Sequence, residues 1–352
     1  MKITAEITGI KYIPKLPREL RKYPLSELAR ALSTDASFLL EMDGGKIFAV
    51  SWWVSAKRTR SYPYARLYDT LTFQGKKVTI IPIFKDEGKD GDRDFLQWDT
   101  VSLMSLLGVY VIIAYYKSAT KNPDYRNKIT NQRYDVDYLK AQLGELLYYQ
   151  SDALHWNMTQ IDKVGELANM ALRSYGSISH ALNIKMHSAE SARKRISELV
   201  KGRDVFLPLS RELAEKAQNR EVVTVQPKEK LSGVKASITI KNYLGGNYFF
   251  TVDEARRENG KILLIEGKHT KTSHLPSLED IKDGLLRMIL YTNLRNVKVD
   301  SEQAIPIPVL LLTTGSDLKS EDLKKEKVFQ HLRDEARSNR FQVMLNNQLV
   351  NL

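Results

Sequence analysis

Short apolar runs separated by turn-forming residues fill the first third of the chain. Runs of about four to eight apolar or alternating residues, rich in Val, Ile and aromatic side chains, are typical of β-strands. Turn signals at Gly44-Gly45 and around Gly75 separate several of them. We therefore predict that residues 1–117 form a mixed α/β region, with strands within KITAEITGIKY, SFLLEMD, KIFAVSWWV, VTIIPIF and VYVIIAYY.

The pattern changes to helical spacing after about residue 118. A polar linker, KSATKNPDYRNKITNQ, is followed by YLKAQLGELLYYQ and IDKVGELANMAL, whose apolar residues recur at helical intervals. A short helix over 177–182, a turn near Asn183 and a second helix over 188–200 then have the proportions of a helix-turn-helix. With VFLPL as the first strand of a wing, residues 118–204 are predicted to form a helical, winged-helix-like region.

The third region, residues 205–352, contains the segment FFTVDEARRENGKILLIEGKHTK. Asn259-Gly260 is a strong signal for a two-residue hairpin turn, because both residues tolerate positive φ. Counting outward from that turn places Asp253 opposite Glu266, and facing side chains share one face of the sheet. Lys268, two residues beyond Glu266, lies on the same face. We therefore expect two carboxylates and an ammonium group to converge.

Two carboxylates this close repel each other unless a cation lies between them. Magnesium suits such a site, because it takes carboxylate oxygens and keeps water and substrate phosphate oxygens in its remaining positions. The alternative is a strand end whose charges are merely solvated. A second alternative concerns the first acid: EARRE at 254–258 is a poor strand sequence, and if it loops out, Glu254 replaces Asp253.

Composition narrows the chemistry further. The 352 residues carry 54 Lys and Arg against 42 Asp and Glu, a net charge of +12 that favours a polyanionic partner such as nucleic acid. The absence of cysteine excludes disulfides and thiolate metal sites, so a catalytic metal should have oxygen ligands. The longest uncharged run, 101–116, is shorter than the roughly 20 residues of a membrane helix. We expect a cytoplasmic protein without a membrane partner.

Two segments are candidates for DNA contact, because basic groups beside hydroxyl or aromatic side chains suit phosphates and bases. The alternatives are an exposed amphipathic loop for the first segment and a helical bundle with a basic face for the second. The candidate residues are Lys57, Arg58, Arg60, Tyr62 and Tyr64 in the first segment, and Ser188, Ser191, Arg193, Lys194 and Arg195 in the second.

Around Asp253, Glu266-Gly267-Lys268 and the helix LPSLEDIKDGLLRMILYTNL, the sequence resembles the PD-(D/E)xK nuclease superfamily and, within it, type II restriction endonucleases. The resemblance covers about the last third of the chain, and Val252 stands where the signature has proline. It implies that Asp253 and Glu266 bind the metal, that Gly267 adds its main-chain carbonyl, and that Lys268 is the catalytic lysine. It also implies a homodimer that cuts a short palindrome.

These observations predict a multi-domain α/β (α+β) protein. A PD-(D/E)xK core with a mixed central sheet flanked by helices would follow the winged-helix-like region and an N-terminal α/β region serving DNA contact or dimerisation. The predicted activity is magnesium-dependent, sequence-specific cleavage of double-stranded DNA, with Mn2+ as a substitute metal. A DNA methyltransferase gene nearby would be its genetic partner. The alternatives are a nuclease selective for branched or damaged DNA and a non-enzymatic DNA-binding regulator.

Overall fold

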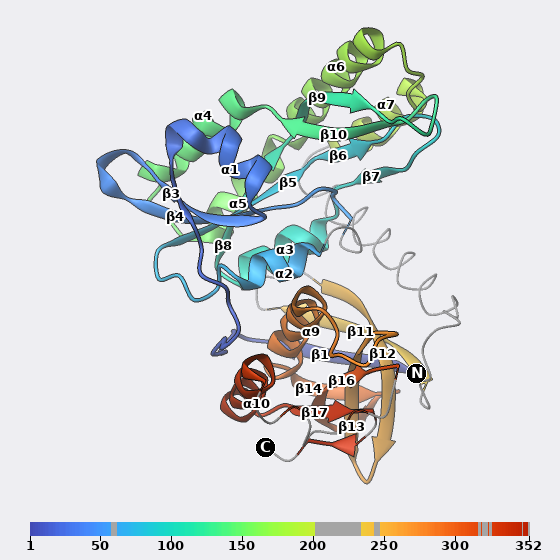
Figure 1. Ribbon diagram of the computed structural model, residues 1–352. Coiled ribbons are helices and arrows are strands. Elements are labelled where there is room, and N and C mark those ends of the chain that lie inside the picture. The colour runs from blue at the N-terminus through green and yellow to red at the C-terminus, as the bar shows by residue number, and fades with distance from the viewer. Residues whose placement is uncertain are drawn as a thin grey trace. The chain divides into compact units, whose positions relative to one another are not determined.

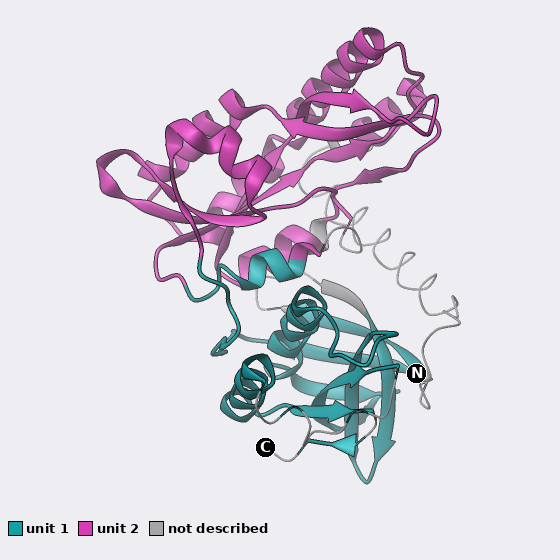
Figure 2. Cartoon of the chain, in the orientation of Figure 1, with its two compact units in different colours: residues 1–19, 64–72, 213–352 teal, residues 20–63, 73–212 magenta. Residues whose placement is uncertain are grey.

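The chain forms two compact units, each built from segments that are far apart in the sequence (Figure 2). The computed structural model describes residues 1–57, 62–200, 234–242, 247–315 and 326–346, together with 318, 323 and 348–350. Unit 1 contains residues 1–19, 64–72 and 213–352, and unit 2 contains residues 20–63 and 73–212. This division differs from the three predicted regions, because two N-terminal segments pack with the last third of the chain.

A mixed nine-stranded sheet forms the centre of unit 1 (Figure 1). Its strand order is β15-β14-β1-β11-β12-β13-β16-β17-β18, and β1 lies between a parallel and an antiparallel neighbour. The strands are β1 (Lys2–Ile7), β11 (Val234–Asn242), β12 (Asn247–Glu258), β13 (Lys261–His269), β14 (Arg295–Val299), β15 (Glu302–Gln303), β16 (Ile305–Thr313), β17 (Gln342–Leu345) and β18 (Gln348–Leu349).

Two helices, α9 (Leu278–Tyr291) and α10 (Lys327–Asn339), cover the β13, β16 and β17 part of this sheet (Figure 1). Helix α9 begins after Ser277, whose Oγ accepts a hydrogen bond from the backbone N–H of Asp280 at 3.1 Å. Helix α9 lies between the parallel strands β13 and β16 in the sequence, and β14 and β15 are inserted before β16.

The short helix α2 (Pro63–Tyr68) and the residues after it bind the helices of unit 1. Tyr68 donates a hydrogen bond to Glu335 of α10 at 2.6 Å. Lys282 of α9 forms a buried ion pair with Asp69, with 2.5 Å between Nζ and Oδ1. Residues 64–72 therefore belong structurally to a unit whose other described helices, α9 and α10, lie more than two hundred residues later.

Unit 2 has a five-stranded sheet in the order β2-β3-β4-β5-β8, and two antiparallel hairpins. The expected strands near residues 37, 47, 78 and 109 are confirmed, because their buried apolar side chains form the core of this sheet. The strands are β2 (Lys22–Pro24), β3 (Ser37–Glu41), β4 (Ile47–Trp52), β5 (Lys76–Pro82) and β8 (Val109–Ala114), with hairpins β6 (Phe84–Asp86) and β7 (Arg93–Phe95), and β9 (Tyr116–Lys121) and β10 (Ile129–Tyr134).

The helices of unit 2 include three that pack on β8, namely α3, α4 and α5. Gly108 ends the α3 segment with a φ of +67°, a left-handed conformation that favours glycine, and β8 begins at the next residue. The helices are α1 (Leu28–Thr34), α3 (Trp98–Leu106), α4 (Val136–Tyr148), α5 (Ala153–Asp162), α6 (Val164–Leu182) and α7 (Ala189–Val200), with 3-10 turns at Leu25–Glu27 and Asp43–Gly45.

The structure corrects two predictions for residues 118–204. The expected polar linker pairs with itself as the β9–β10 hairpin. The expected short helix over 177–182 is the last part of α6, which has 19 residues because its apolar face continues back to Val164. The turn at Asn183 and the helix after it are confirmed, and Asn183 adopts a left-handed conformation with φ of 50°. The predicted wing strand VFLPL lies outside the described residues.

The described residues thus form a mixed α/β protein with several sheets, in agreement with the α+β class. In this part of the chain, every helix is too short or too polar to cross a lipid bilayer.

Candidate active site

The hairpin of β12 and β13 has the register predicted from Asn259-Gly260. Glu258 pairs with Lys261 and Glu254 pairs with Ile265, so the poor strand sequence EARRE is fully paired. Positive φ values of 47° at Asn259 and 74° at Gly260 explain the choice of these two residues for the turn. The same register, continued by one residue, places Asp253 opposite Glu266.

The three predicted catalytic side chains lie together at this end of the hairpin. The Lys268 ammonium is 3.1 Å from Oε1 of Glu266. The Asp253 carboxylate accepts a hydrogen bond through Oδ2 from the backbone N–H of Gly267 at 2.9 Å. Gly267 lies between Glu266 and Lys268 on β13. Its backbone amide therefore holds the Asp253 carboxylate next to these two residues.

Helix α9 adds an acid and a base to this cluster. Asp283 accepts a hydrogen bond from the Lys268 ammonium at 2.7 Å, and Nε of Arg287 lies 3.9 Å from Oε1 of Glu266. The guanidinium of Arg287 also lies over the ring of Tyr64, with 5.8 Å between Cζ and the ring centroid. The cluster therefore holds three carboxylates and two cations, with Glu266 buried and the other side chains partly exposed.

Gly284 allows α9 to approach β13 this closely. A Cβ atom at this position would lie 2.6 Å from Cδ1 of Leu310 and 3.2 Å from Cε of Lys268. Since the first distance is shorter than real Cβ contacts, a larger residue would require the Leu310 side chain or the helix to shift. The glycine thus brings the neighbouring Asp283 within hydrogen-bonding reach of Lys268.

Burial and charge shift the pKa values in the site strongly. Burial, and then the neighbouring Asp253 carboxylate, raise the pKa of Glu266 from 4.5 to about 7. Burial lowers the pKa of Lys268, but the carboxylates of Glu266 and Asp283 outweigh it and raise this pKa well above the usual lysine value. At neutral pH Lys268 is therefore a fixed cation, while Glu266 is close to its titration midpoint.

One atom of the cluster fits a bound cation. Oε2 of Glu266 is buried and has no hydrogen-bond partner in the described part of the chain, which is costly for a carboxylate oxygen. Among the same residues, no three His, Asp or Glu side chains are arranged to hold a metal ion. The protein ligands available here are thus two carboxylates and main-chain oxygens, a small donor set of the kind that Mg2+ completes with water.

Glu254, the alternative to Asp253, pairs directly with Ile265 in the β12–β13 register. Its carboxylate is fully buried and forms an ion pair with Arg256. The paired register therefore favours Asp253 over Glu254 as the companion of Glu266.

Sequence reasoning missed the contribution of α9. It used the apolar side chains of this helix and overlooked Asp283, Arg287 and Tyr291, which are spaced by four residues and so share a face. Tyr291 is buried beside the cluster, and burial followed by the Glu266 charge raises its pKa. The signal was the spacing of polar residues on a helix that follows the acid–lysine pair.

The predicted DNA-contacting residues have different surroundings. The candidate residues in and just before α7 differ in exposure: Ala192 and Ile196 are buried and Arg195 is half-buried, while the exposed residues are Ser188, Ser191, Arg193 and Lys194. Arg93 of β7 donates to the Ser188 carbonyl and to Oγ of Ser191, at 3.1 and 2.8 Å. Both serines are therefore already hydrogen-bonded to a strand of their own unit.

The first candidate segment needs one correction. Lys57 and Tyr62 are exposed, whereas Arg58 and Arg60 lie outside the described residues. Tyr64 is only 2% exposed, because it packs in the core of unit 1 against Arg287. Its ring is therefore not accessible for stacking on a base.

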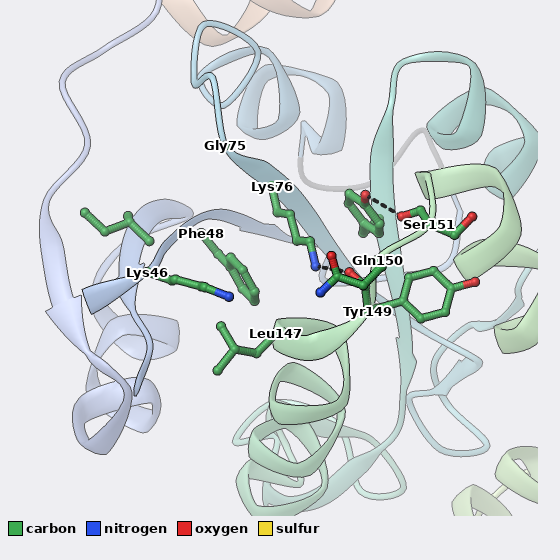
Figure 3. Close-up of a pocket in the computed structure, with 10 residues that line it drawn as sticks. Lys46, Phe48, Gly75, Lys76, Leu147, Tyr149, Gln150 and Ser151 are labelled. Carbon is green, nitrogen blue, oxygen red and sulfur yellow. Dashed lines mark hydrogen bonds between the residues drawn. The ribbon is translucent and has the colours of Figure 1, made fainter. Parts of the chain in front are cut away.

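A pocket of about 360 Å³ in unit 2 has a structural explanation (Figure 3). The Lys76 ammonium donates to the carbonyl oxygens of Leu146 and Tyr149 at 2.5 and 2.7 Å, and so caps the C-terminal end of α4. Burial and the nearby Lys46 ammonium lower the pKa of Lys76. None of the predicted site residues that the structure describes lines this pocket.

Comparison with family models, with curated proteins and with solved structures finds no match to this chain. The function must therefore be argued from the site itself.

Proposed function

We propose that the protein is a magnesium-dependent endonuclease that cuts double-stranded DNA at specific sequences, as type II restriction enzymes of the PD-(D/E)xK superfamily do. The observation that carries this proposal is the convergence of Asp253, Glu266 and Lys268, where Oε2 of Glu266 is buried and has no hydrogen-bond partner among the described residues. The net charge of +12 supports a polyanionic substrate.

The carboxylates of Asp253 and Glu266 would hold the metal ion, with the main-chain carbonyl of Gly267 as a third ligand. When bound, Mg2+ would polarise the scissile phosphate and lower the pKa of a water molecule. Ionisation of Glu266 would be favoured by this charge, since a nearby cation lowers the pKa of a carboxyl group.

Lys268 would offset the negative charge that develops on phosphorus oxygens or orient the attacking water. Its hydrogen bond to Asp283 and its contact with Glu266 fix the ammonium group in place. Because the raised pKa keeps this lysine protonated, it would act as a positive charge and a hydrogen-bond donor rather than as a base.

The test is a digest of sequenced phage DNA by the full-length protein in the presence of Mg2+. We expect discrete fragments, loss of cleavage when the metal is chelated, and cleavage when Mn2+ replaces Mg2+. Lys268→Ala should abolish cleavage but retain DNA binding in Ca2+. Lys261→Ala removes an exposed lysine at the other end of β13 and is the matched control. Cleavage of normal rate by Lys268→Ala would reject the site.

Two other outcomes identify the alternative functions. Cutting of only branched or mispaired DNA would indicate a structure-selective nuclease. Salt-sensitive DNA binding without any metal-dependent cleavage would indicate a DNA-binding regulator.

A further inference from the structure

A second pocket of unit 2 is lined by several cationic side chains. It has a volume of about 330 Å³ and, among the described residues, is lined by three cations and two amides but no carboxylate: Lys121, Arg126, Asn127, Asn183 and Lys185. All three cationic side chains are exposed, and none forms an ion pair within the described part of the chain. Because like charges repel, such a pocket favours a bound anion.

The residues that line this pocket come from two separate parts of unit 2, the β9–β10 hairpin and the connection between α6 and α7, elements that are labelled in Figure 1. Lys121 ends β9, and Arg126 and Asn127 lie in the turn that leads to β10. Lys185 lies in the connection between α6 and α7. The cations are therefore brought together by tertiary structure, since the hairpin turn meets the interhelical connection.

Backbone hydrogen bonds fix these two walls to each other. Oδ1 of Asn127 accepts from the backbone N–H of Lys185 at 3.2 Å, and the Lys185 carbonyl accepts from the N–H of Lys89 at 2.9 Å. The N–H of Asn127 donates to Asp90 at 2.8 Å. Gly88 passes so close that a Cβ atom there would lie 2.3 Å from the Asn127 carbonyl oxygen. The positions from which the three cations extend are therefore preorganised.

Other cations of unit 2, in contrast, already have partners. Lys85 and Lys128 both pair with Glu87, at 2.7 and 3.4 Å, and Lys117 pairs with Asp135 at 3.1 Å. In the pocket of Figure 3, Lys76 uses its ammonium to cap α4. Positive charge is thus concentrated in the pocket lined by Lys121, Arg126 and Lys185, where it is available to a bound anion.

We propose that this pocket binds a backbone phosphate of duplex DNA. The proposal rests on the proposed DNA substrate and adds a contact site that lies outside the catalytic cluster. Lys185 lies shortly before α7, whose exposed Arg193 and Lys194 are among the predicted DNA contacts, so the pocket continues that surface. Phosphate contacts of this kind fix the orientation of a protein on DNA, while base contacts select the sequence.

The experiment compares two triple variants of the full-length protein. Lys121→Gln, Arg126→Gln and Lys185→Gln together neutralise the pocket. Lys22→Gln, Arg30→Gln and Lys163→Gln together remove the same charge from exposed lysines and an arginine of unit 2 that already pair with Glu41, Glu27 and Glu145. Binding of a labelled duplex is measured by fluorescence anisotropy over a range of salt concentrations, in Ca2+ so that binding is separated from cutting.

We expect the pocket variant to bind about tenfold more weakly, equally for any sequence. The slope of log K against log salt should fall by about 1 for each phosphate that the variant no longer neutralises. The control variant should change both quantities much less. Lys121→Arg with Lys185→Arg should keep wild-type binding. Circular dichroism of the triple and single variants verifies that the fold is retained.

Equal weakening of binding in the two triple variants, or an unchanged salt slope in the pocket variant, would overturn the proposal. These outcomes are independent of catalysis. DNA binding that needs the pocket, in a protein that does not cut, would reject the nuclease and leave the pocket standing. Normal DNA cutting and binding by the pocket variant would reject the pocket and support the nuclease.

Discussion

At the scale of single residues, Glu266 links the stability of the protein to pH. Its folded-state pKa of about 7 exceeds the ordinary value of 4.5, so the folded protein binds a proton that the unfolded chain releases. The stability contributed by this group is therefore complete below about pH 4.5 and is lost as the pH rises through 7. Without a metal ion, the ionised form costs up to about 3 kcal/mol at pH 8.

Glu266→Gln is accordingly predicted to raise the melting temperature of the metal-free protein at pH 8, relative to wild type, and to have little effect at pH 5. Ca2+ should stabilise the wild-type protein at pH 8 but not the variant, because the buried carboxylate is missing. Thermal melting at both pH values, with and without Ca2+, tests this prediction. Equal stabilisation of both proteins by Ca2+ would place the ion elsewhere.

Asp283 is predicted to position Lys268, since its carboxylate accepts the 2.7 Å hydrogen bond from the ammonium. Asp283→Asn should lower kcat of DNA cleavage by about 10- to 100-fold and leave KM and Ca2+-dependent binding unchanged, because small misplacements of a catalytic group are costly. Glu279→Gln, which neutralises an exposed acid on the same helix, is the control. A loss of binding without a change in kcat would assign Asp283 to substrate contact instead.

At the scale of secondary-structure elements, residues 64–72 and α9 depend on the buried pair of Asp69 and Lys282. Asp69→Ala would leave a buried ammonium without this partner, and we expect it to lower the free energy of unfolding by about 3–5 kcal/mol. The double variant Asp69→Leu, Lys282→Met should recover most of this loss, because it removes both charges. Urea denaturation measures the free energy of unfolding of both variants. If Asp69→Ala is as stable as wild type, the Lys282 ammonium has found another partner.

Local sequence signals predicted the elements that depend on neighbouring residues. Asn259-Gly260 specifies its turn, and that turn alone determines which residues of β12 and β13 face each other. The α9 cap at Ser277 and the Gly108 break are equally local. Asp253, Glu266 and Lys268 could therefore be placed together from the sequence.

Features that depend on distant partners could not be predicted in this way. Nothing near Lys2–Ile7 indicates that this strand pairs with Val234–Asn242, and the apolar pattern of α2 does not show that Tyr64 packs under Arg287. The polar β9–β10 hairpin lacks the alternating apolar residues that mark a strand. Asp283 joined the site only when the helix crossing placed it over Lys268.

At the scale of the whole molecule, unit 1 needs its N-terminal segment. Ile3, Ala5 and Ile7 are buried in β1 between β11 and β14, and Tyr12 donates to Glu335 at 2.7 Å. Deletion of residues 1–19 is therefore predicted to unfold much of unit 1 and to abolish cleavage. Hydrogen exchange should show reduced protection in β11, β13 and β16 but not in β5 or β8 of unit 2. Unchanged protection in β11 would contradict the role of β1.

The pairing of β1 with β11 has a consequence for synthesis on the ribosome. The strand Lys2–Ile7 is made first, but its parallel partner begins only at Val234, so at ordinary translation rates it waits roughly 10–45 s before it can pair. All of unit 2 is translated during this interval. Helix α9 and β16 follow later still, so the cluster around Glu266 assembles only when the nascent chain is nearly complete.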